Sequence, residues 1–314
     1  MQNTTVKKGL HLRSMVPLVG LLFVLVLFVA LTRGSILHFS NLEVITNQAF
    51  GVMLVGAGAV FVHAYGGIDL SLGSLQGICC LFIVLLVRAG WNPIPVMAVS
   101  IITGIASGFL VGGSSVLFGI PVFITSLCMN FILRGALQVA TAKEMMYLPA
   151  SFVALDQWGL KIAVLLVVLV ISFFMFNYTR FGKYERAIGG SEVVAKLSGV
   201  NVARYRTLAH VLAGAYTGIV AFFATARAST VYPASGQSFE MDVLIALVLG
   251  GLSLSGGSST RIRCAVLGAL TIALMENGFI LVGVDPNAIQ GIKGLIFIAT
   301  VIFSYERKKG QVVN

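Results

Sequence analysis

Long apolar runs, separated by short polar or Gly- and Pro-containing breaks, occupy most of this chain of 314 residues. A run of about 17–25 apolar residues is long enough for an α-helix to cross a hydrocarbon core of roughly 30 Å. Such runs can be marked at 15–32, 44–64, 70–88, 94–113, 121–140, 161–178, 207–226, 240–255, 262–284 and 289–304. The pattern predicts an all-α polytopic membrane protein with about ten transmembrane helices in a single domain over residues 1–314.

Composition supports this prediction and argues against a soluble domain. Hydrophobic residues make up 58% of the chain and charged residues 10%, and the mean hydropathy is +0.98. A soluble domain carries about a quarter charged residues. The first run follows a basic head and lacks a small-residue cleavage pattern, so we expect it to be retained as a first helix.

The positions of Lys and Arg predict the orientation, because basic residues are retained on the cytoplasmic side. With a cytoplasmic N-terminus, fourteen of the 21 Lys and Arg residues fall in cytoplasmic segments, among them Lys7, Lys8, Arg13 and residues 307–309. Both termini are therefore expected to be cytoplasmic. The net charge of +10 follows from this topology and from anionic lipid at the inner face, so it implies no nucleic-acid partner.

The motifs of catalysis and metal binding are missing from the sequence. The four cysteines, Cys79, Cys80, Cys128 and Cys264, have no C-x-x-C spacing and are expected to be buried, inert thiols. No H-E-x-x-H or G-x-S-x-G motif occurs, so we expect neither a metal site nor a hydrolytic enzyme. No G-x-x-x-x-G-K-[ST] loop occurs either. If ATP drives this protein, another subunit must bind the ATP and its magnesium.

A polar island from Asn177 to Arg206 interrupts the apolar pattern and holds six basic residues. Within it, Ser191 suits a helix N-cap, Glu192 the first turn, Lys196 the last turn and Gly199 the C′ stop, which predicts a helix of about two turns. Val193, Val194 and Leu197 would form a small apolar stripe on this helix. The stripe either rests on the membrane surface or neighbouring helix ends, or fits a groove on a partner.

Two glycine-rich nonapeptides resemble each other: GGIDLSLGS from Gly66 to Ser74 and GGLSLSGGS from Gly250 to Ser258. Paired Gly-interrupted segments in two halves of a membrane protein point to a transport path, although they can also serve close helix packing. The helix count places both on the cytoplasmic side. Asp69 is expected to cap a helix that begins at Leu70, or else to line or gate the path together with Ser71, with Ser253 as the neutral counterpart in the second copy.

Polar residues inside apolar runs are a further group of candidates, because they are costly in a bilayer. Glu276 and Asn277 should face the interior, with a role in the path or in buried hydrogen bonding. Asn130 is a further path candidate and shares a helix face with Arg134, which is expected to reach the far interface.

The chain resembles a known family in several motifs at once: GGIDLSLGSL, FITSLCMNFILRGA, TRFGKYERAIGGSEVVAKLSGVNVARYR, FEMDVLIALVLGGLSLSGG and ENGFILVGV. They are similar to the permease subunits of bacterial ATP-binding cassette (ABC) importers for ribose, other monosaccharides and autoinducer-2. The resemblance implies an inner-membrane permease pair on two cassette ATPase domains, served by a periplasmic or lipid-anchored binding protein. It also implies a cytoplasmic coupling segment, about 178–206, whose short helix fits a groove on the ATPase. The matching residues are Gly189, Gly190, Ser191, Glu192, Ala195, Leu197, Ser198, Gly199 and Val200.

The expected function is therefore alternating-access import of a small polar solute, with a monosaccharide favoured by the resemblance and ATP hydrolysed by a partner. The alternative is an ion-coupled secondary transporter in which Asp69 and Glu276 are the coupling carboxylates. A membrane-embedded enzyme would need a nucleophile and a base, and the sequence offers no convergent set of these. The sequence leaves open which solute is carried and whether the permease pairs with itself or with a paralogue.

Overall fold

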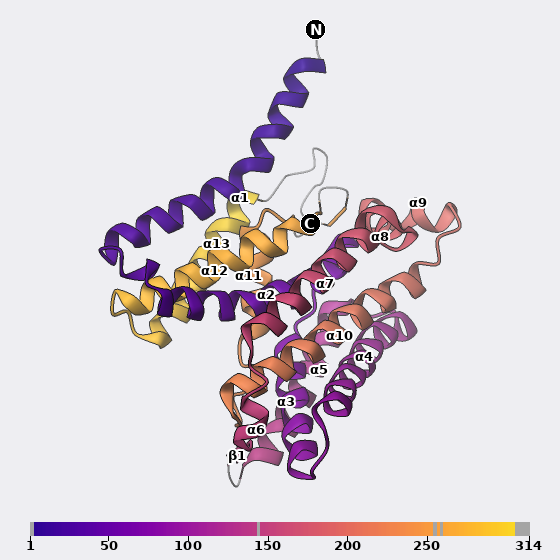
Figure 1. The fold of residues 1–314 in the computed structure, drawn as a ribbon. Coiled ribbons are helices and arrows are strands. Elements are labelled where there is room, and N and C mark those ends of the chain that lie inside the picture. Colours follow the sequence, from indigo (N-terminus) through magenta and orange to yellow (C-terminus); the bar gives the residue numbers. More distant parts are fainter. Residues whose placement is uncertain (1–2, 143–144, 254–255, 258–259, 305–314) are drawn as a thin grey trace.

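The computed structural model describes residues 3–142, 145–253, 256–257 and 260–304, and nearly all of them are helical. Figure 1 shows the arrangement. The helices are α1 (Asn3–Leu31), the 3₁₀ helix η1 (Ser35–Leu37), α2 (Phe39–Ala64), α3 (Leu72–Arg88), α4 (Pro93–Phe118), α5 (Val122–Thr141), α6 (Ala150–Val153), α7 (Trp158–Tyr178), α8 (Arg180–Gly190), α9 (Glu192–Leu197), α10 (Val202–Ala228), α11 (Phe239–Leu249), α12 (Arg263–Leu281) and α13 (Pro286–Ser304). The short strands β1 (Met146–Tyr147) and β2 (Thr230–Val231) pair antiparallel.

A helix lies over each of the ten predicted runs, so the prediction of a helical protein is confirmed. Within the described residues, six helices are long and apolar enough to cross a membrane: α2, α4, α5, α7, α10 and α12. The apolar parts of α1, α3 and α13 are shorter. The count of ten spans and the side of the termini stay predictions, and residues 307–309 lie outside the described part.

The eighth predicted run, 240–255, is only partly helical. Its helix α11 has 11 residues, about 16 Å long at the usual rise, which is too short to cross a bilayer. It ends at Leu249 because Gly250 caps it and Gly251 takes a left-handed conformation, with φ of +88°. The run is therefore a half-length helix followed by irregular backbone.

Helix α2 forms the centre of the molecule. Every residue from Ala49 to Ala64 is buried, as expected of a helix that is apolar on all sides. Its small residues allow close neighbours: Gly58 faces the backbone of Ala213 in α10, and Gly56 faces Ala265 in α12. Phe61 packs edge-on against Phe176 of α7.

Helices α4 and α10 make the most extensive helix contact, and small residues create it. A Cβ atom on Gly104 would collide with the carbonyl of Gly214, and one on Gly108 with the carbonyl of His210. The Ser100 hydroxyl donates to the Gly218 carbonyl across the same contact (2.8 Å). Backbones approach this closely in membranes when small residues line the seam.

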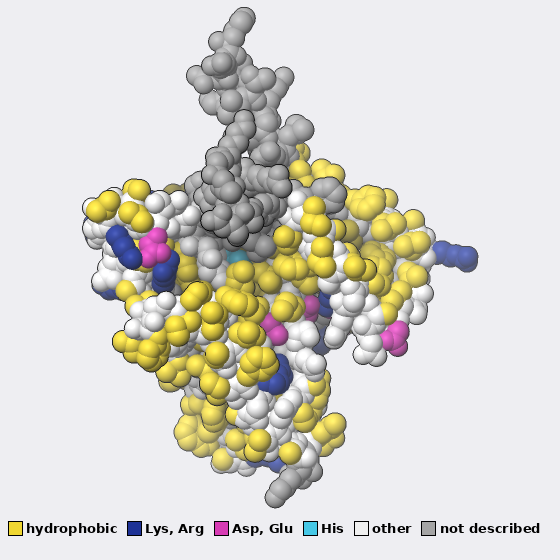
Figure 2. Space-filling model, turned by 180° about the vertical axis from the view of Figure 1, so that it is seen from behind, with side chains coloured by type: hydrophobic (Ala, Val, Ile, Leu, Met, Phe, Trp, Pro, Cys, Tyr) yellow, Lys and Arg dark blue, Asp and Glu magenta, His cyan; other side chains and the backbone are white. Residues whose placement is uncertain are grey.

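The outer surface suits a lipid environment. Figure 2 shows a face dominated by apolar side chains, with charged side chains in a few separate places. One cysteine belongs to this surface: Cys128 on α5 is exposed, whereas Cys79, Cys80 and Cys264 are buried. The prediction that all four thiols are buried was wrong for Cys128, because α5 packs through its opposite side and leaves that face uncovered.

Candidate functional site

The predicted short helix of the polar island exists as α9, and its ends follow the predicted signals. The Ser191 hydroxyl accepts a hydrogen bond from the Val194 N–H (3.4 Å), and Glu192 pairs with Lys196 one turn later (2.7 Å). At the other end, the N–H groups of Gly199 and Val200 donate to the carbonyls of Lys196 and Ala195 (3.0 Å each), with φ of +79° at Gly199. Local sequence chemistry thus fixes this helix at both ends.

The apolar stripe of α9 is exposed. Val193, Val194 and Leu197 are 66%, 60% and 85% exposed, while Ala195 faces inward and is buried. In Figure 1, α8 and α9 lie at one end of the molecule, and β1 and α6 lie at another end, with α4 and α10 running between them. The described part of the chain therefore leaves a projecting helix with three large apolar side chains uncovered.

Helix α8, which sequence reasoning did not identify, anchors α9. The Thr179 hydroxyl accepts from the Phe181 N–H at its start (3.2 Å), and Phe181 stacks on Phe61 of α2 with ring centroids 4.9 Å apart. Its Glu185 is fully buried, and neither carboxyl oxygen has a hydrogen-bond partner in the described structure. Burial raises the pKa of Glu185, against the opposing charge of Arg206.

The end of α8 brings the two glycine motifs together. A Cβ atom on Gly189 would collide with the Ala64 carbonyl at the end of α2 and with the backbone nitrogen of Gly257. The Gly257 N–H donates to that same Ala64 carbonyl (2.8 Å), and Gly256 lies against the backbone of Gly66. The described parts of the two motifs therefore lie side by side, while their placement on the cytoplasmic side stays a prediction; Leu254, Ser255 and Ser258 lie outside the described residues.

A buried hydrogen-bonded chain fixes the first motif. One carboxylate oxygen of Asp69 accepts from the backbone N–H (2.9 Å) and the hydroxyl (2.6 Å) of Ser71, and the other lies 2.6 Å from Nδ1 of His210 in α10. Nε2 of His210 lies 2.7 Å from the Tyr65 hydroxyl. An imidazole that donates from Nδ1 and accepts at Nε2 satisfies all three groups at once.

Asp69 does not cap a helix at Leu70, as its position in the sequence had suggested. Helix α3 begins at Leu72 with Ser71 as its N-cap, because the Asp69 carboxylate folds onto Ser71 in an Asx-type turn. The Leu70 N–H instead donates to the Ser126 hydroxyl of α5 (3.1 Å). Asp69 therefore acts through His210 and Ser71 on the start of α3.

Arg206 connects α9 to this buried chain. Its guanidinium pairs with the Glu192 carboxylate in the first turn of α9 (2.5 Å) and lies over the Tyr65 ring, 5.3 Å from its centroid. The hydrogen bond from Lys196 is the main cause that holds the pKa of Glu192 below its usual value; burial opposes it, and the charge of Arg206 adds to it. Contacts thus run without a break from α9 through Arg206, Tyr65 and His210 to Asp69.

A cavity of about 410 Å³ lies in the half of the molecule remote from α9. Asn47 and Gln48 line it from the first part of α2, and Ala64, which touches the glycine motifs, lies about 25 Å further along that helix. Lys161 lines it from the first turn of α7 and Arg227 from the last turn of α10. The cavity therefore lies toward the end of the molecule opposite α9.

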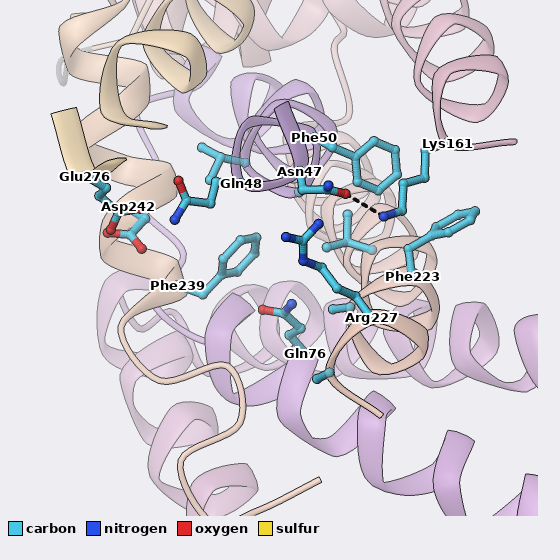
Figure 3. A pocket seen from close by; sticks show the side chains of 15 residues that line it. Asn47, Gln48, Phe50, Gln76, Lys161, Phe223, Arg227, Phe239, Asp242 and Glu276 are labelled. Atoms are coloured by element: carbon cyan, nitrogen blue, oxygen red, sulfur yellow. Dashed lines mark hydrogen bonds between the residues drawn. The ribbon is translucent and has the colours of Figure 1, made fainter. Parts of the chain in front are cut away.

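Hydrogen bonds and ion pairs hold part of the cavity wall in place. Lys161 donates to the Asn47 side-chain oxygen (2.5 Å) and forms an ion pair with Asp156. On the other side, Lys293 of α13 forms ion pairs with Asp242 and Glu276, and its distance to Asp242 is 2.7 Å. Figure 3 shows Asp242 and Glu276 on one side of the cavity and Lys161 on the other, with Gln48, Gln76 and Arg227 between them.

The remaining predicted residues lie apart from one another. Asn130 is within hydrogen-bonding reach of the Glu240 carboxylate, and Arg134 donates to the carbonyls of Ser235 (2.7 Å) and Gly236 (3.1 Å). That Arg134 reaches the far interface stays a prediction. Of the neighbours Glu276 and Asn277, Glu276 lines the cavity, whereas Asn277 is buried and its side-chain oxygen has no partner in the described part of the chain. Ser253 is half-buried beyond the end of α11.

Sequence reasoning missed His210, Gln48, Gln76 and Arg227. Gln48 and Gln76 stand in apolar runs, where an uncharged amide is also costly, and that signal points to both of them. His210 has no local signal, because its partner Asp69 is 141 residues away. Arg227 follows an apolar run, where a basic residue is ordinarily assigned to the membrane boundary.

Comparison with known proteins places these features in a family. Residues 41–301 match the family described as "Branched-chain amino acid transport system / permease component". The chain is 28% identical to the ribose import permease protein RbsC of Escherichia coli K12 over 298 residues, covering 91% of this chain and 92% of RbsC. It is 30% identical to the fructose import permease protein FrcC of Rhizobium meliloti (93% and 86% covered) and 31% identical to the L-arabinose transport system permease protein AraH of Escherichia coli K12 (82% and 80% covered). No solved structure matches the chain.

Proposed function

The chain belongs to the permease family of the branched-chain amino acid transport systems, and from this premise we propose that it is the membrane permease subunit of an ABC importer for a monosaccharide. The observation that carries the proposal is its similarity, over more than four-fifths of its length, to permeases for ribose, fructose and arabinose. ATP and magnesium bind to a separate ATPase subunit, and this chain performs no bond-breaking chemistry. Its place is the inner membrane.

The partner that covers α9 is the cassette ATPase. Three large apolar side chains on a capped, projecting helix support this assignment, because a cluster of exposed apolar side chains is typical of a protein interaction site. The residues engaged would be Gly189 to Gly199, with Leu197 at the tip. A second permease, identical or related, completes the pathway, and a periplasmic or lipid-anchored binding protein delivers the sugar at the opposite face.

Coupling proceeds through the contacts between α9 and the glycine motifs. When ATP closes the ATPase dimer, displacement of α9 pulls on Arg206 through Glu192, and Arg206 lies on the Tyr65 ring beside His210 and Asp69. The backbone contacts of Gly189 carry the same displacement to the second motif at Gly257. Packed elements with two discrete arrangements convert small shifts into alternating access.

The proposed path residues have different tasks. Asp69 and Ser71 hold the start of α3, Ser253 belongs to the second glycine motif, and Glu276 lines the cavity. Asn130 and Asn277 are path candidates outside the cavity lining. Gating therefore rests on the two motifs, while the cavity holds the solute.

The test is import by the assembled complex in proteoliposomes. Leu197→Asp and Glu192→Arg should abolish ATP-driven sugar uptake and co-purification of the ATPase, because they place charge on the docking surface and break the link to Arg206. Ala154→Asp, on an exposed position at the end of α6 and outside the coupling segment, is the matched control and should retain the ATPase. Normal uptake by both α9 variants would contradict the docking role, and uptake by the chain alone that an uncoupler abolishes would replace the importer with an ion-coupled transporter.

A further inference from the structure

We propose that the cavity between α2, α3, α7, α10, α11 and α12 is a binding station for a neutral monosaccharide, with Gln48, Gln76 and Arg227 as the side chains that hydrogen-bond to its hydroxyl groups. This inference rests on the proposed function and names the part of the chain that the solute touches. The cavity volume of about 410 Å³ is within the usual range of small-molecule sites.

Three polar side chains of the cavity wall lack hydrogen-bond partners among the residues that the structure describes. The amide oxygens of Gln48 and Gln76 are buried without a hydrogen bond, and Gln76 as a whole is 8% exposed. None of the hydrogen bonds or ion pairs in the described structure includes Arg227. Because an unsatisfied buried polar group costs about 1–3 kcal/mol, groups of this kind are retained where a ligand or water satisfies them.

The three side chains come from separate helices and point into one space. Gln48 is on α2, Gln76 on α3 and Arg227 on α10, and Figure 3 shows all three directed between the walls of the cavity. Amides offer both a donor and an acceptor, and the guanidinium offers a planar set of donors. Neighbouring hydroxyl groups on a sugar ring, each a donor and an acceptor, match this combination.

Aromatic side chains supply the apolar part of the wall. Phe50, Phe223 and Phe239 line the same cavity, and Phe50 and Phe223 pack edge-on with ring centroids 5.4 Å apart. A few convergent polar groups set in an apolar and aromatic wall are typical of a small-molecule site. The C–H faces of a sugar ring would lie against these rings.

The charges at the cavity favour a neutral ligand. Lys161 and Arg227 line it together with Asp242 and Glu276. Lys161 is paired with Asp156, and Lys293 is paired with Asp242 and Glu276. Together with Arg227, this makes three positive and three negative groups, whose charges balance. A sugar acid or an amino sugar would bring an uncompensated charge into this balanced set, whereas a neutral polyol does not.

The position of Gln76 links binding to gating. It lies one turn after Leu72, the first residue of α3, whose start is held by Asp69 and Ser71. A shift of the first glycine motif therefore moves Gln76 relative to Gln48 and Arg227, which stand on other helices. Separation of the three groups would release the sugar when the motif rearranges.

A cysteine-protection experiment on the full chain in lipid nanodiscs tests the proposal. Ala228, which lines the cavity, is replaced by Cys, and the exposed Cys128 is replaced by Ser, while the other three thiols are buried. D-ribose, D-fructose or L-arabinose should slow the reaction of the new thiol with a methanethiosulfonate reagent. A thiol at Ala203, which is exposed near α9, should react at an unchanged rate.

A further substitution in the Ala228→Cys variant then tests which side chains bind the sugar. Gln76→Leu or Arg227→Met should raise the sugar concentration needed for protection roughly tenfold, the loss expected for one hydrogen bond. Gln138→Leu, an exposed glutamine outside the cavity, should not change it. Protection by none of the three sugars, or equal protection in the Gln76, Arg227 and Gln138 variants, would overturn the site, and stronger protection by D-galacturonate or D-glucosamine would overturn the neutral class.

The same variants in the assembled importer separate this inference from the function on which it rests. If the unmodified complex shows no ATP-driven uptake of any of the three sugars, the proposed function fails. If the unmodified complex imports a sugar, and the Gln76→Leu and Arg227→Met complexes import that sugar equally well, only the assignment of the cavity fails. The expected result is uptake reduced several-fold in both variants, with ATP hydrolysis still stimulated by the loaded binding protein.

Discussion

Removal of the His210 imidazole should be among the most destabilising single changes in this protein. The imidazole is fully buried and lies 2.6 Å from the Asp69 carboxylate and 2.7 Å from the Tyr65 hydroxyl. In His210→Leu, the carboxylate keeps only its two hydrogen bonds from Ser71, and the hydroxyl has no partner. A lost hydrogen bond to a buried charged group costs about 1.5–3 kcal/mol, and an unpartnered buried hydroxyl costs about 1–3 kcal/mol more.

A double-mutant cycle isolates the contribution of the pair. Asp69→Leu leaves a buried imidazole N–H and the Ser71 donors unsatisfied, at about 1–3 kcal/mol for each group. The double variant removes both partners, so the combined loss should fall short of the sum by about 1–3 kcal/mol. His210→Asn should recover part of the loss, because its amide N–H can donate to Asp69 from nearly the same place.

Equilibrium unfolding in mixed micelles, followed by the fluorescence of Trp91 and Trp158, supplies the free energies. The buried neutral pair Ser172 and Tyr216 (2.9 Å) is the control, and Tyr216→Phe should cost only about 0.5–1.5 kcal/mol. Strict additivity of Asp69→Leu and His210→Leu would refute the reasoning, as would a loss in His210→Leu no larger than that of the control.

Other substitutions probe the coupling segment and the helix core. The stability of the unmodified protein should fall with rising pH, and Glu185→Gln should remove this fall; the midpoints of unfolding measure both. Because burial raises the pKa of Glu185, the folded state binds more protons above the unfolded value of about 4.3. Gly108→Leu should lower the free energy of unfolding by about 1–3 kcal/mol through collision with α10, whereas Gly135→Leu, with open space around it, should be nearly neutral. Gly199→Val should raise hydrogen exchange in α9, because a branched side chain at φ of +79° costs roughly 1–2 kcal/mol.

Features set by neighbouring residues could be predicted from the sequence. The N-cap at Ser191 and the stop at Gly199 are local signals, and α9 has the ends that they specify. The ten apolar runs likewise correspond to helices, because hydrophobicity over a long window decides them. Helix α8 was missed because its 11 residues are rich in charge and too short to form a long apolar run, and a tertiary contact of Phe181 with α2 holds it in place.

Features set by distant residues could not be predicted in this way. The partner of Asp69 is on α10, and the cavity collects side chains from six helices, so neither follows from spacing along the chain. The predicted start of α3, at Leu70, was wrong by two residues, because a tertiary contact of Asp69 with His210 competes with local capping. The helix predicted over 240–255 is longer than α11, because the apolar composition continues past the glycines that end the helix.

The central claim is that ATP bound elsewhere drives sugar through this chain by way of α9. The most direct measurement is the ratio of sugar imported to ATP hydrolysed by proteoliposomes that contain the complete importer, with and without Leu197→Asp. The account predicts ATP-dependent uptake by the unmodified complex, and in the variant a loss of uptake together with a loss of bound ATPase. An unchanged ratio and unchanged uptake in a variant that retains its ATPase would contradict it.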